Sequence, residues 1–260
     1  MYAVKTGLQQ LRQELQPDLI IANADGATHG FGLGRNHSLY LRKLGVDVIT
    51  LGDQAYFKKD MVQHIHGARF ILRPANLPQE SPGRGWIIRT VNDQKVGIIS
   101  FLGQSGFGRM HGNNPFTYLP MLVEKIRSET SHILLEFHAT TTAEKNTMFW
   151  HADGRVSAVI GTGTRVQTAD ERVLPRGTAV ITDLGRTGSI GSVAGHKPET
   201  EIAQFVRAIP LKSEDAWQDV RLQGAYIQLA DDGRAESIER ISRSITVHGQ
   251  DGQDSARNSA

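Results

Sequence analysis

Four hydrophobic stretches of the chain run directly into polar loops that carry acidic, histidine or threonine side chains. The stretches and their loops span residues 19–30, 46–54, 132–142 and 156–170. Among the loop residues are Asp25, His29, Asp53 and His138. Carboxylate and imidazole groups are the side chains from which proteins assemble oxygen- and nitrogen-ligated metal sites. Because ligands of open α/β sheets bind where the strands end, four such ends side by side would form one site.

Taken singly, each of these side chains has a plainer interpretation, since an acid or imidazole at a strand end is more often a turn or hydrogen-bonding residue. Convergence of several would favour a metal site, but the sequence alone does not show convergence. Both interpretations stay open on these residues.

Three other patterns resemble catalytic or binding motifs and lack what those motifs need. Residues 30–34 resemble a dinucleotide fingerprint, but a polar loop separates them from their strand and the glycine spacing is incomplete. Residues 103–106 resemble a nucleophile elbow without the glycine two positions after the serine. His64 and His66 are two positions apart on a predicted helix and point in different directions, so their charge complements the helix dipole instead.

Hydrophobic periodicity and turn residues place these loops within an alternation of helices and strands. Helices are predicted over residues 1–16, 37–44, 60–66, 115–128, 142–151 and 199–208. Strands are predicted over residues 19–23, 46–51, 69–72, 86–91, 95–102, 133–137, 156–160, 178–184, 220–229 and 234–245. This order predicts an α/β fold with a mixed sheet or two facing sheets and helices outside.

Composition narrows the class of protein. The 260 residues are 39% hydrophobic, which is enough for a core, and 29 basic against 27 acidic residues leave no basic run that would indicate a nucleic-acid surface. The absence of cysteine excludes disulfides and Cys-ligated zinc. No apolar run approaches the ~20 residues that span a bilayer, and residues 1–16 are too polar for a signal peptide. We therefore expect a cytoplasmic protein with no membrane partner.

Six stretches, in order along the chain, carry a family resemblance. They are HGFGLG (29–34), RPANLP (73–78), SPGRG (81–85), FHATTTAEK (137–145), DGRVSAVIGT (153–162) and VQTADERVLPRGTAVITDLGRTG (166–188). From residue 1 to about 245 the chain resembles the YmdB-type branch of the calcineurin-like metallophosphoesterases. The resemblance implies a sandwich of β-sheets flanked by helices, a metal-dependent phosphodiesterase acting on 2′,3′-cyclic nucleotides, and a homo-oligomer.

The resemblance also implies that most of the family's two-metal site has changed in this chain. The family uses an Asp on its first strand, a Glu-Asn pair, an Asn-His pair, a lone His and a His-x-His. The pairs fall on Asp25-Gly26 and Asp53-Gln54, the lone His is kept as His138, and the His-x-His falls on residues 163–165. The first strand and its Asp are missing. We therefore expect residues 1–248 to form a single domain without that strand, followed by a disordered tail over 249–260.

Residues 1–5 align with the inside of the family's first helix, which favours Met1 as an internal methionine over Met1 as the true start. At the family's proton-donor position, Gln54 cannot donate a proton as an imidazolium does, so no catalytic residue is assigned. Asp25, Asp53 and His138 remain as ligands for at most one weakly bound iron, manganese or zinc ion, and no cofactor is expected.

Arg165 puts a fixed positive charge where the family holds a metal, so it is predicted to bind phosphate together with His29. The first hypothesis is thus a pseudoenzyme that binds a phosphate-containing small molecule or nucleotide. The alternatives are a weak metal-dependent phosphodiesterase acting on cyclic nucleotides and an oligomeric scaffold whose former active face docks a protein.

Overall fold

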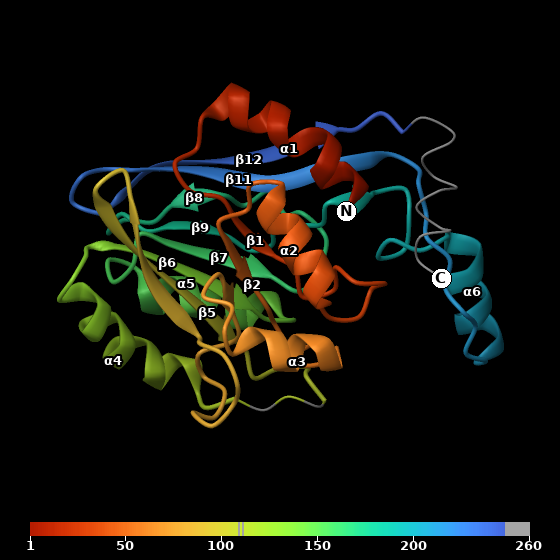
Figure 1. Cartoon of the computed structure of the whole chain (residues 1–260), viewed down its shortest axis with the longest axis horizontal. Helices are drawn as coiled ribbons and strands as arrows, with labels where there is room; N and C mark the ends of the chain where they lie inside the picture. The colour runs from red at the N-terminus through yellow and green to blue at the C-terminus, as the bar shows by residue number, and fades with distance from the viewer. Residues whose placement is uncertain (109, 111, 248–260) are drawn as a thin grey trace. The chain divides into compact units, whose positions relative to one another are not determined.

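The computed structural model describes residues 1–108, 110 and 112–247, so the tail predicted to be disordered lies outside the described residues. The helices are α1 (Tyr2–Leu15), α2 (Arg35–Lys43), α3 (Lys59–Ile65), α4 (Pro115–Arg127), α5 (Thr142–Ala152) and α6 (Pro198–Arg207) (Figure 1). The strands are β1 (Ile21–Asn23), β2 (Val48–Thr50), β3 (Ile71–Leu72), β4 (Trp86–Val91), β5 (Gln94–Leu102), β6 (His132–His138), β7 (Ala158–Thr162), β8 (Arg172–Val173), β9 (Ala179–Ile181), β10 (Gly188–Ser189), β11 (Val220–Leu229) and β12 (Ala235–Ser244).

Each predicted helix and strand has a counterpart among these elements, with ends that shift by a few residues. Periodicity did not predict β8 and β10, because each has only two residues and shows no repeat. No helix in the described part of the chain is long and apolar enough to cross a membrane.

The chain divides into two compact units. The larger unit comprises residues 17–184 and 225–240, and the smaller comprises residues 1–16, 185–224 and, among the described residues, 241–247. In the larger unit six strands form a mixed sheet in the order β4-β5-β6-β7-β9-β8, in which β5, β6, β7 and β9 run parallel. A second sheet, β1-β2-β3, is entirely parallel. The predicted α/β class with more than one sheet is confirmed.

Side chains on β6 alternate between the two faces of the mixed sheet, as the period of two in a strand requires. Ile133, Leu135 and Phe137 are fully buried in the apolar layer that also contains the inner side chains of α4 and α5. On the opposite face Leu134 packs with residues of β2 and β3. Glu136 and His138 follow Leu134 at spacings of two, so they share this second face.

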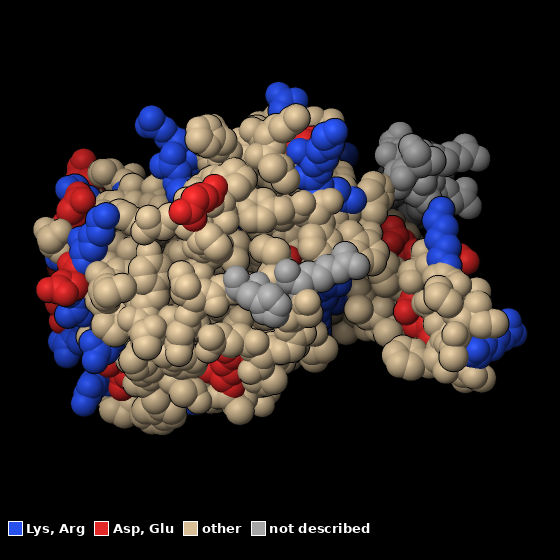
Figure 2. All heavy atoms as spheres, turned by 90° about the horizontal axis from the view of Figure 1, so that it is seen from below, with Lys and Arg blue, Asp and Glu red and all other residues tan. Residues whose placement is uncertain are grey.

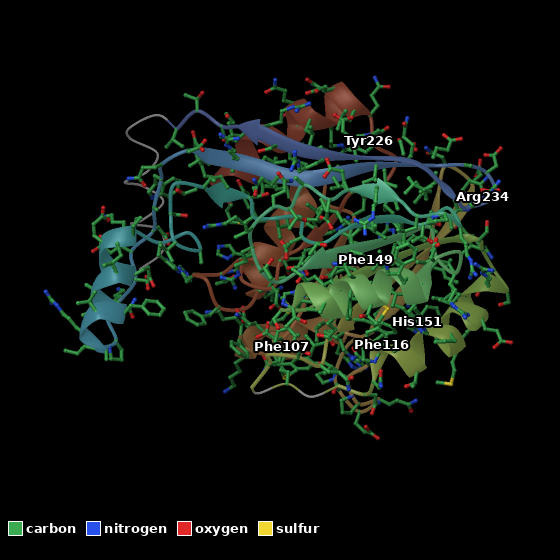
Figure 3. The ribbon with its side chains drawn as sticks, turned by 180° about the vertical axis from the view of Figure 1, so that it is seen from behind. Phe107, Phe116, Phe149, His151, Tyr226 and Arg234 are labelled. Carbon is green, nitrogen blue, oxygen red and sulfur yellow. The ribbon has the colours of Figure 1, made fainter. Side chains whose placement is uncertain are left out.

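Helices α4 and α5 cover the first face through aromatic contacts (Figure 3). Phe116 near the start of α4 meets His151 near the end of α5, with ring centroids 5.7 Å apart. His151 Nε2 lies 2.8 Å from the carbonyl oxygen of Phe116. Phe149 on α5 is fully buried in the same layer. This packing holds α5, and with it the loop before α5, against the sheet.

In the smaller unit α1 packs closely on residues at or near the ends of β11 and β12. A Cβ added to Gly7 would lie 2.6 Å from Ile245 Cδ1, so the absence of a side chain permits this approach. Arg243 pairs with Glu14 of α1 at 2.6 Å. Tyr2 meets Trp217 edge to face at 6.0 Å.

A buried ion pair fixes the loop that follows β7. Lys145 of α5 and Asp183, which follows β9, are both fully buried, and Lys145 Nζ lies 2.8 Å from Asp183 Oδ2. The same oxygen accepts from the backbone N–H of Thr164 at 2.9 Å and from its hydroxyl at 2.7 Å. A carboxylate with three donors at one oxygen therefore determines where residues 163–165 lie.

We expect Lys145→Met to reduce the free energy of unfolding by ~3–5 kcal/mol, because it leaves the Asp183 carboxylate buried without its cation. Urea unfolding followed by circular dichroism measures this loss. The matched control is Lys59→Met at an exposed position of α3, which should change stability by less than ~0.5 kcal/mol. Equal effects of the two substitutions would contradict the assigned role of the pair.

Candidate functional site

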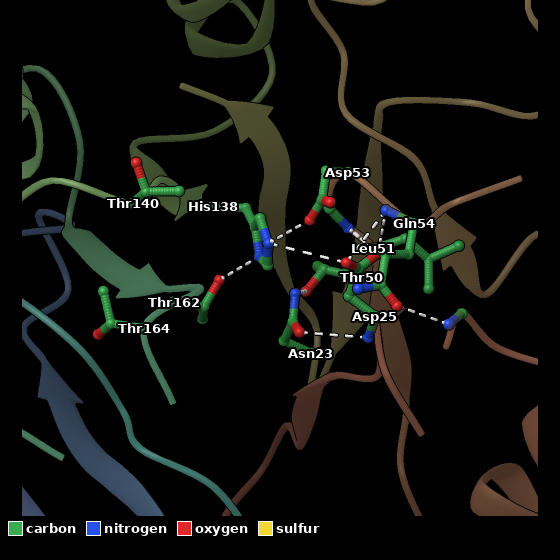
Figure 4. A network of polar contacts seen from close by, with 12 residues as sticks. Asn23, Asp25, Thr50, Leu51, Asp53, Gln54, His138, Thr140, Thr162 and Thr164 are labelled. Carbon is green, nitrogen blue, oxygen red and sulfur yellow. Dashed lines mark hydrogen bonds and ion pairs between the residues drawn. The ribbon is translucent and has the colours of Figure 1, made fainter. Parts of the chain in front are cut away.

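The acidic and histidine side chains predicted from the strand ends do converge. Asp25 follows β1, Asp53 follows β2, and His138 is the last residue of β6. One ligand atom from each of the three side chains lies within 4.8 Å of the others. His138 Nε2 is 3.1 Å from Asp53 Oδ1 and 3.7 Å from Asp25 Oδ2 (Figure 4). Parallel strands that end at one edge of their sheets bring these groups together.

His138 is held between two neighbours. A Cβ added to Gly52 would overlap the imidazole ring, so only glycine allows the loop after β2 to pass this close. The ring of Phe107 stacks on the imidazole of His138, with ring centroids 5.7 Å apart and an angle of 24° between the planes. The ring orientation of His138 is therefore set by packing as well as by hydrogen bonds.

The Phe107 loop is anchored to the start of α5. Glu144 accepts from the backbone N–H groups of Gln104 at 2.6 Å and Ser105 at 3.2 Å. The hydroxyl of Thr140 donates to the carbonyl oxygen of Ser105 at 2.7 Å. These bonds explain why residues 103–106, which resemble a nucleophile elbow, serve instead to position an aromatic ring.

Sequence reasoning missed Glu136, which is buried behind His138. Its carboxylate accepts from Asn23 Nδ2 at 3.1 Å, from the Ser100 hydroxyl at 2.8 Å and from the Thr162 hydroxyl. Since the Thr162 hydroxyl hydrogen points to Glu136, its oxygen accepts from Nδ1–H of His138, 2.8 Å away. This chain of bonds leaves His138 Nε2 facing the two aspartates. The available signal was a glutamate two positions before His138 within a buried strand, on the same face.

Asp25 has a structural role in addition to its place beside His138. Its Oδ1 accepts from the backbone N–H of Gly52 at 2.6 Å, and its Oδ2 accepts from that of Gln54 at 3.1 Å. Gln54 in turn uses its side-chain oxygen to accept from the N–H of Gly32 at 2.7 Å. Asp25 and Gln54 thus join the loops after β1 and β2 to each other.

The ionisable groups of this cluster shift one another's proton affinity. Burial raises the pKa of Asp25 and of Glu136, because the charged form loses solvation. Burial lowers the pKa of His138, but the Asp53 hydrogen bond and the neighbouring carboxylates outweigh it, so the pKa is raised. Burial raises the pKa of Asp53, but the hydrogen bond and the charge of His138 outweigh burial and leave the pKa lowered. The favoured state is an imidazolium paired with Asp53.

Arg165 lies beside Gly26. A Cβ on Gly26 would be 2.8 Å from Arg165 Nη2 and 3.3 Å from the carbonyl oxygen of Gly30. Arg165 has a positive φ of 62° and is half-buried in the loop fixed by Asp183. The glycine thus leaves room for the guanidinium. His29, next to Gly30, is exposed, and the cluster of three metal-ligating groups does not include it.

Two solved structures share this fold over nearly the whole chain. A novel phosphatase from Mycoplasma pneumoniae matches with a TM-score of 0.86 and 33% identity, covering 93% of this chain and 87% of that one. A hypothetical protein from Thermus thermophilus matches with a TM-score of 0.85 and 32% identity, covering 94% of this chain and 93% of that one. The fold, with acids and a histidine at the carboxyl edge of its sheets, is that of the calcineurin-like metallophosphoesterases.

Sequence comparison narrows this class to one family. The family model described as YmdB-like protein matches residues 1–241. The 2′,3′-cyclic-nucleotide 2′-phosphodiesterase of Bacillus subtilis (strain 168) is 36% identical over 239 residues, which is 92% of this chain and 90% of the relative. The chain belongs to the YmdB-like family, as the resemblance in its sequence predicted.

Metallophosphoesterases normally use divalent metals, and three of the residues present could hold such an ion. Asp25, Asp53 and His138 offer two carboxylate oxygens and one imidazole nitrogen, a donor set that suits iron, manganese or zinc. Among the described residues no second group of three such side chains lies close enough to hold another ion. Arg165 brings a cation to the segment 163–165, on which the resemblance places the family's His-x-His. The described residues thus offer one group of three such ligands.

We expect the metal-free protein to become less stable as the pH rises above neutrality. The raised pKa of His138 means that its stabilising charge is fully present below its unfolded pKa of ~6.5 and is lost as the pH rises through the folded pKa. Asp25 and Glu136, whose pKa values are also raised, act in the same direction. The stabilisation from Asp53 is lost only in acid, as the pH falls below ~3.9 and through its lowered pKa.

Urea unfolding in EDTA between pH 5 and pH 9 measures this effect, and the Asp53→Asn variant isolates the pair. That substitution should lower the pKa of His138. The decrease in the free energy of unfolding toward high pH should then be smaller, by ~1.4 kcal/mol for each unit by which the pKa falls. Asp231→Asn, on an exposed hairpin turn, is the control and should retain the wild-type slope. A wild-type slope in Asp53→Asn would show that His138 does not depend on Asp53.

Proposed function

We propose that this chain binds a phosphate-containing nucleotide at the carboxyl edge of its sheets, with Arg165 as the anion-binding group. The observation that carries this proposal is the position of the Arg165 guanidinium beside Gly26. Its side chain forms no hydrogen bond or ion pair with any other described residue, so its donors are available to a ligand. A guanidinium binds phosphate through two parallel hydrogen bonds, which an ammonium group cannot reproduce.

The charge state of the neighbouring cluster supports an anionic ligand. A phosphate near two free carboxylates would be repelled, but the raised pKa values of Asp25 and His138 both reduce the negative charge there. The exposed His29 lies in the turn that reaches Gly26 through Gly30, and we assign it as a second phosphate contact. Binding by this arrangement requires no hydrolysis, so a pseudoenzyme is the form of the family that the site supports best.

We expect Arg165→Ala to weaken the binding of 2′,3′-cyclic AMP by about tenfold or more, which corresponds to ~1.4 kcal/mol or more. Isothermal titration calorimetry on metal-free protein measures the affinity, with adenosine as the ligand that lacks phosphate. Arg165→Lys keeps the positive charge without the bidentate geometry, so its affinity for the cyclic nucleotide should lie between those of the wild type and Arg165→Ala.

The matched control is Arg69→Ala, which removes an exposed arginine that precedes β3 at the opposite end of that strand. It should bind as the wild type does. If Arg165→Ala and Arg69→Ala bind the nucleotide equally well, Arg165 is not the phosphate contact. Equal affinity for adenosine and the cyclic nucleotide would also exclude phosphate recognition.

A second candidate function is a metal-dependent phosphodiesterase that uses a single ion. The mutual distances of Asp25, Asp53 and His138 favour it, as does the activity named for the Bacillus subtilis relative. These three side chains would hold the ion, with Thr162 and Glu136 fixing His138. A bound divalent ion would lower the pKa of a water molecule and attract a phosphate oxygen.

Under this second function, protein supplied with manganese should retain one ion per chain and hydrolyse 2′,3′-cyclic AMP. Plasma mass spectrometry after gel filtration measures the ion, and chromatography of the products measures hydrolysis. Both should be lost in Asp53→Ala and in His138→Gln, while Arg165→Ala should keep its ion. Hydrolysis that persists without the ion, or in His138→Gln, would exclude this site.

Other predictions from the sequence remain proposals. These are the cytoplasmic location, the homo-oligomer and the scaffold in which the former active face docks a protein.

A further inference from the structure

A cavity of about 300 Å³ lies at the edge of the mixed sheet where its parallel strands begin. Because β6, β7 and β9 run parallel, the residues that precede them meet at this edge, whereas His138 lies at the other. Ser131, Val156 and Gly177 line the cavity and lie just before these three strands. All of them belong to the larger unit. The cavity is therefore separate from the candidate site described above.

Three arginine side chains line this cavity. Arg127 is the last residue of α4, Arg176 lies shortly before β9, and Arg234 precedes β12 (Figure 3). Among the described residues the one acidic side chain in the lining is that of Asp232. Three guanidinium groups against one carboxylate leave the lining with a net charge of +2. At the left of Figure 2, where α4 ends, Lys and Arg side chains gather with Asp and Glu among them.

Two glycines allow the arginine side chains to lie against the cavity wall. A Cβ added to Gly154 would lie 2.9 Å from Cβ of Arg176, and one added to Gly177 would lie 2.9 Å from Cδ of Arg234. Both glycines have a positive φ, 75° and 90° respectively, which other residues rarely adopt. The stems of the two arginines therefore pack directly on the backbone of neighbouring turns, and this packing limits where their guanidinium groups can lie.

The hydrogen bonds of the three guanidinium groups differ. Arg127 Nη2 donates to the carbonyl oxygens of residues 154 and 155, each at 3.0 Å, which holds this group in place. Arg234 Nε donates to Asp232 Oδ2 at 2.7 Å. The side chain of Arg176 forms no hydrogen bond or ion pair with any other described residue. Since a guanidinium has more donors than these bonds use, all three groups keep donors for a ligand.

We propose that this cavity binds a small multivalent oxyanion, with Arg176 as its main contact and Arg234 as a second. Guanidinium groups bind phosphate and carboxylate groups through paired hydrogen bonds, and the net positive charge of the lining favours a ligand with two or more negative charges. The volume lies at the lower end of the range of ~300–1,000 Å³ for small-molecule sites, which suits a diphosphate or a small polycarboxylate. The proposal does not depend on the nucleotide site at Arg165.

Isothermal titration calorimetry with inorganic pyrophosphate and with citrate tests the proposal. The protein is the metal-free full chain carrying Arg165→Ala, so that neither anion can bind through a metal ion or at the proposed nucleotide site. At least one of the two anions should bind, and the tighter one identifies whether the site prefers phosphate or carboxylate groups. Adding Arg176→Ala should weaken its binding by about tenfold or more, and Arg234→Ala by about threefold or more.

The matched control is Arg155→Ala, which removes an exposed arginine of an adjacent turn that does not line the cavity. It should change the affinity by less than about twofold, because exposed charges are screened. Circular dichroism of Arg176→Ala should show an unchanged fold, since this side chain is exposed and has no partner among the described residues.

Modification of arginines by phenylglyoxal, mapped by mass spectrometry, locates the bound anion. At ten times its Kd, the anion should slow the modification of Arg176 by about tenfold, and leave that of Arg155 unchanged. The proposal would be overturned if neither anion binds, or if Arg176→Ala and Arg155→Ala bind the anion equally well. Protection that is the same at Arg155 and Arg176 would also contradict it.

Discussion

Burial of ionisable groups at the ends of parallel strands is the constraint on which the larger unit depends. Asp25, Glu136 and His138 all lie under the surface, where an isolated charge is costly. The cost is met by neighbours. Glu136 accepts hydrogen bonds from side chains on three strands or their ends, and Asp25 accepts from two backbone N–H groups. His138 is hydrogen-bonded to Asp53. The same groups that could bind a ligand therefore also join the two sheets.

This double role gives the polar edge a structural function in addition to any binding of a ligand. Removal of Asp25 would free the N–H groups of the loop after β2, and removal of His138 would leave Gly52 facing a cavity. Gly26 and Arg165 are complementary in size, because the arginine side chain extends into space that a side chain at residue 26 would fill.

The sequence allowed the elements to be predicted from their periodicity, and it indicated Asp25, Asp53 and His138 as candidate ligands at strand ends. That the three side chains converge was left open by the sequence and required the structure. The sequence did not indicate Glu136 or Asn23, whose importance arises from pairing across two sheets. The restraint on Arg165 by the Lys145–Asp183 pair was equally hidden, as it joins a helix, a strand end and a loop. The exposure of α6, in which no residue is buried, was hidden as well, because an amphipathic helix usually buries its apolar face.

The hydrogen bond from Asn23 to Glu136 joins residues that are 113 positions apart. Closing so long a segment costs chain entropy before any contact at the site is gained, and contacts of this kind slow folding. The complete site therefore requires both sheets to be in place, since its residues come from both. A molecule that binds only the assembled site therefore raises the free energy of unfolding of the whole unit, by an amount that grows with its concentration.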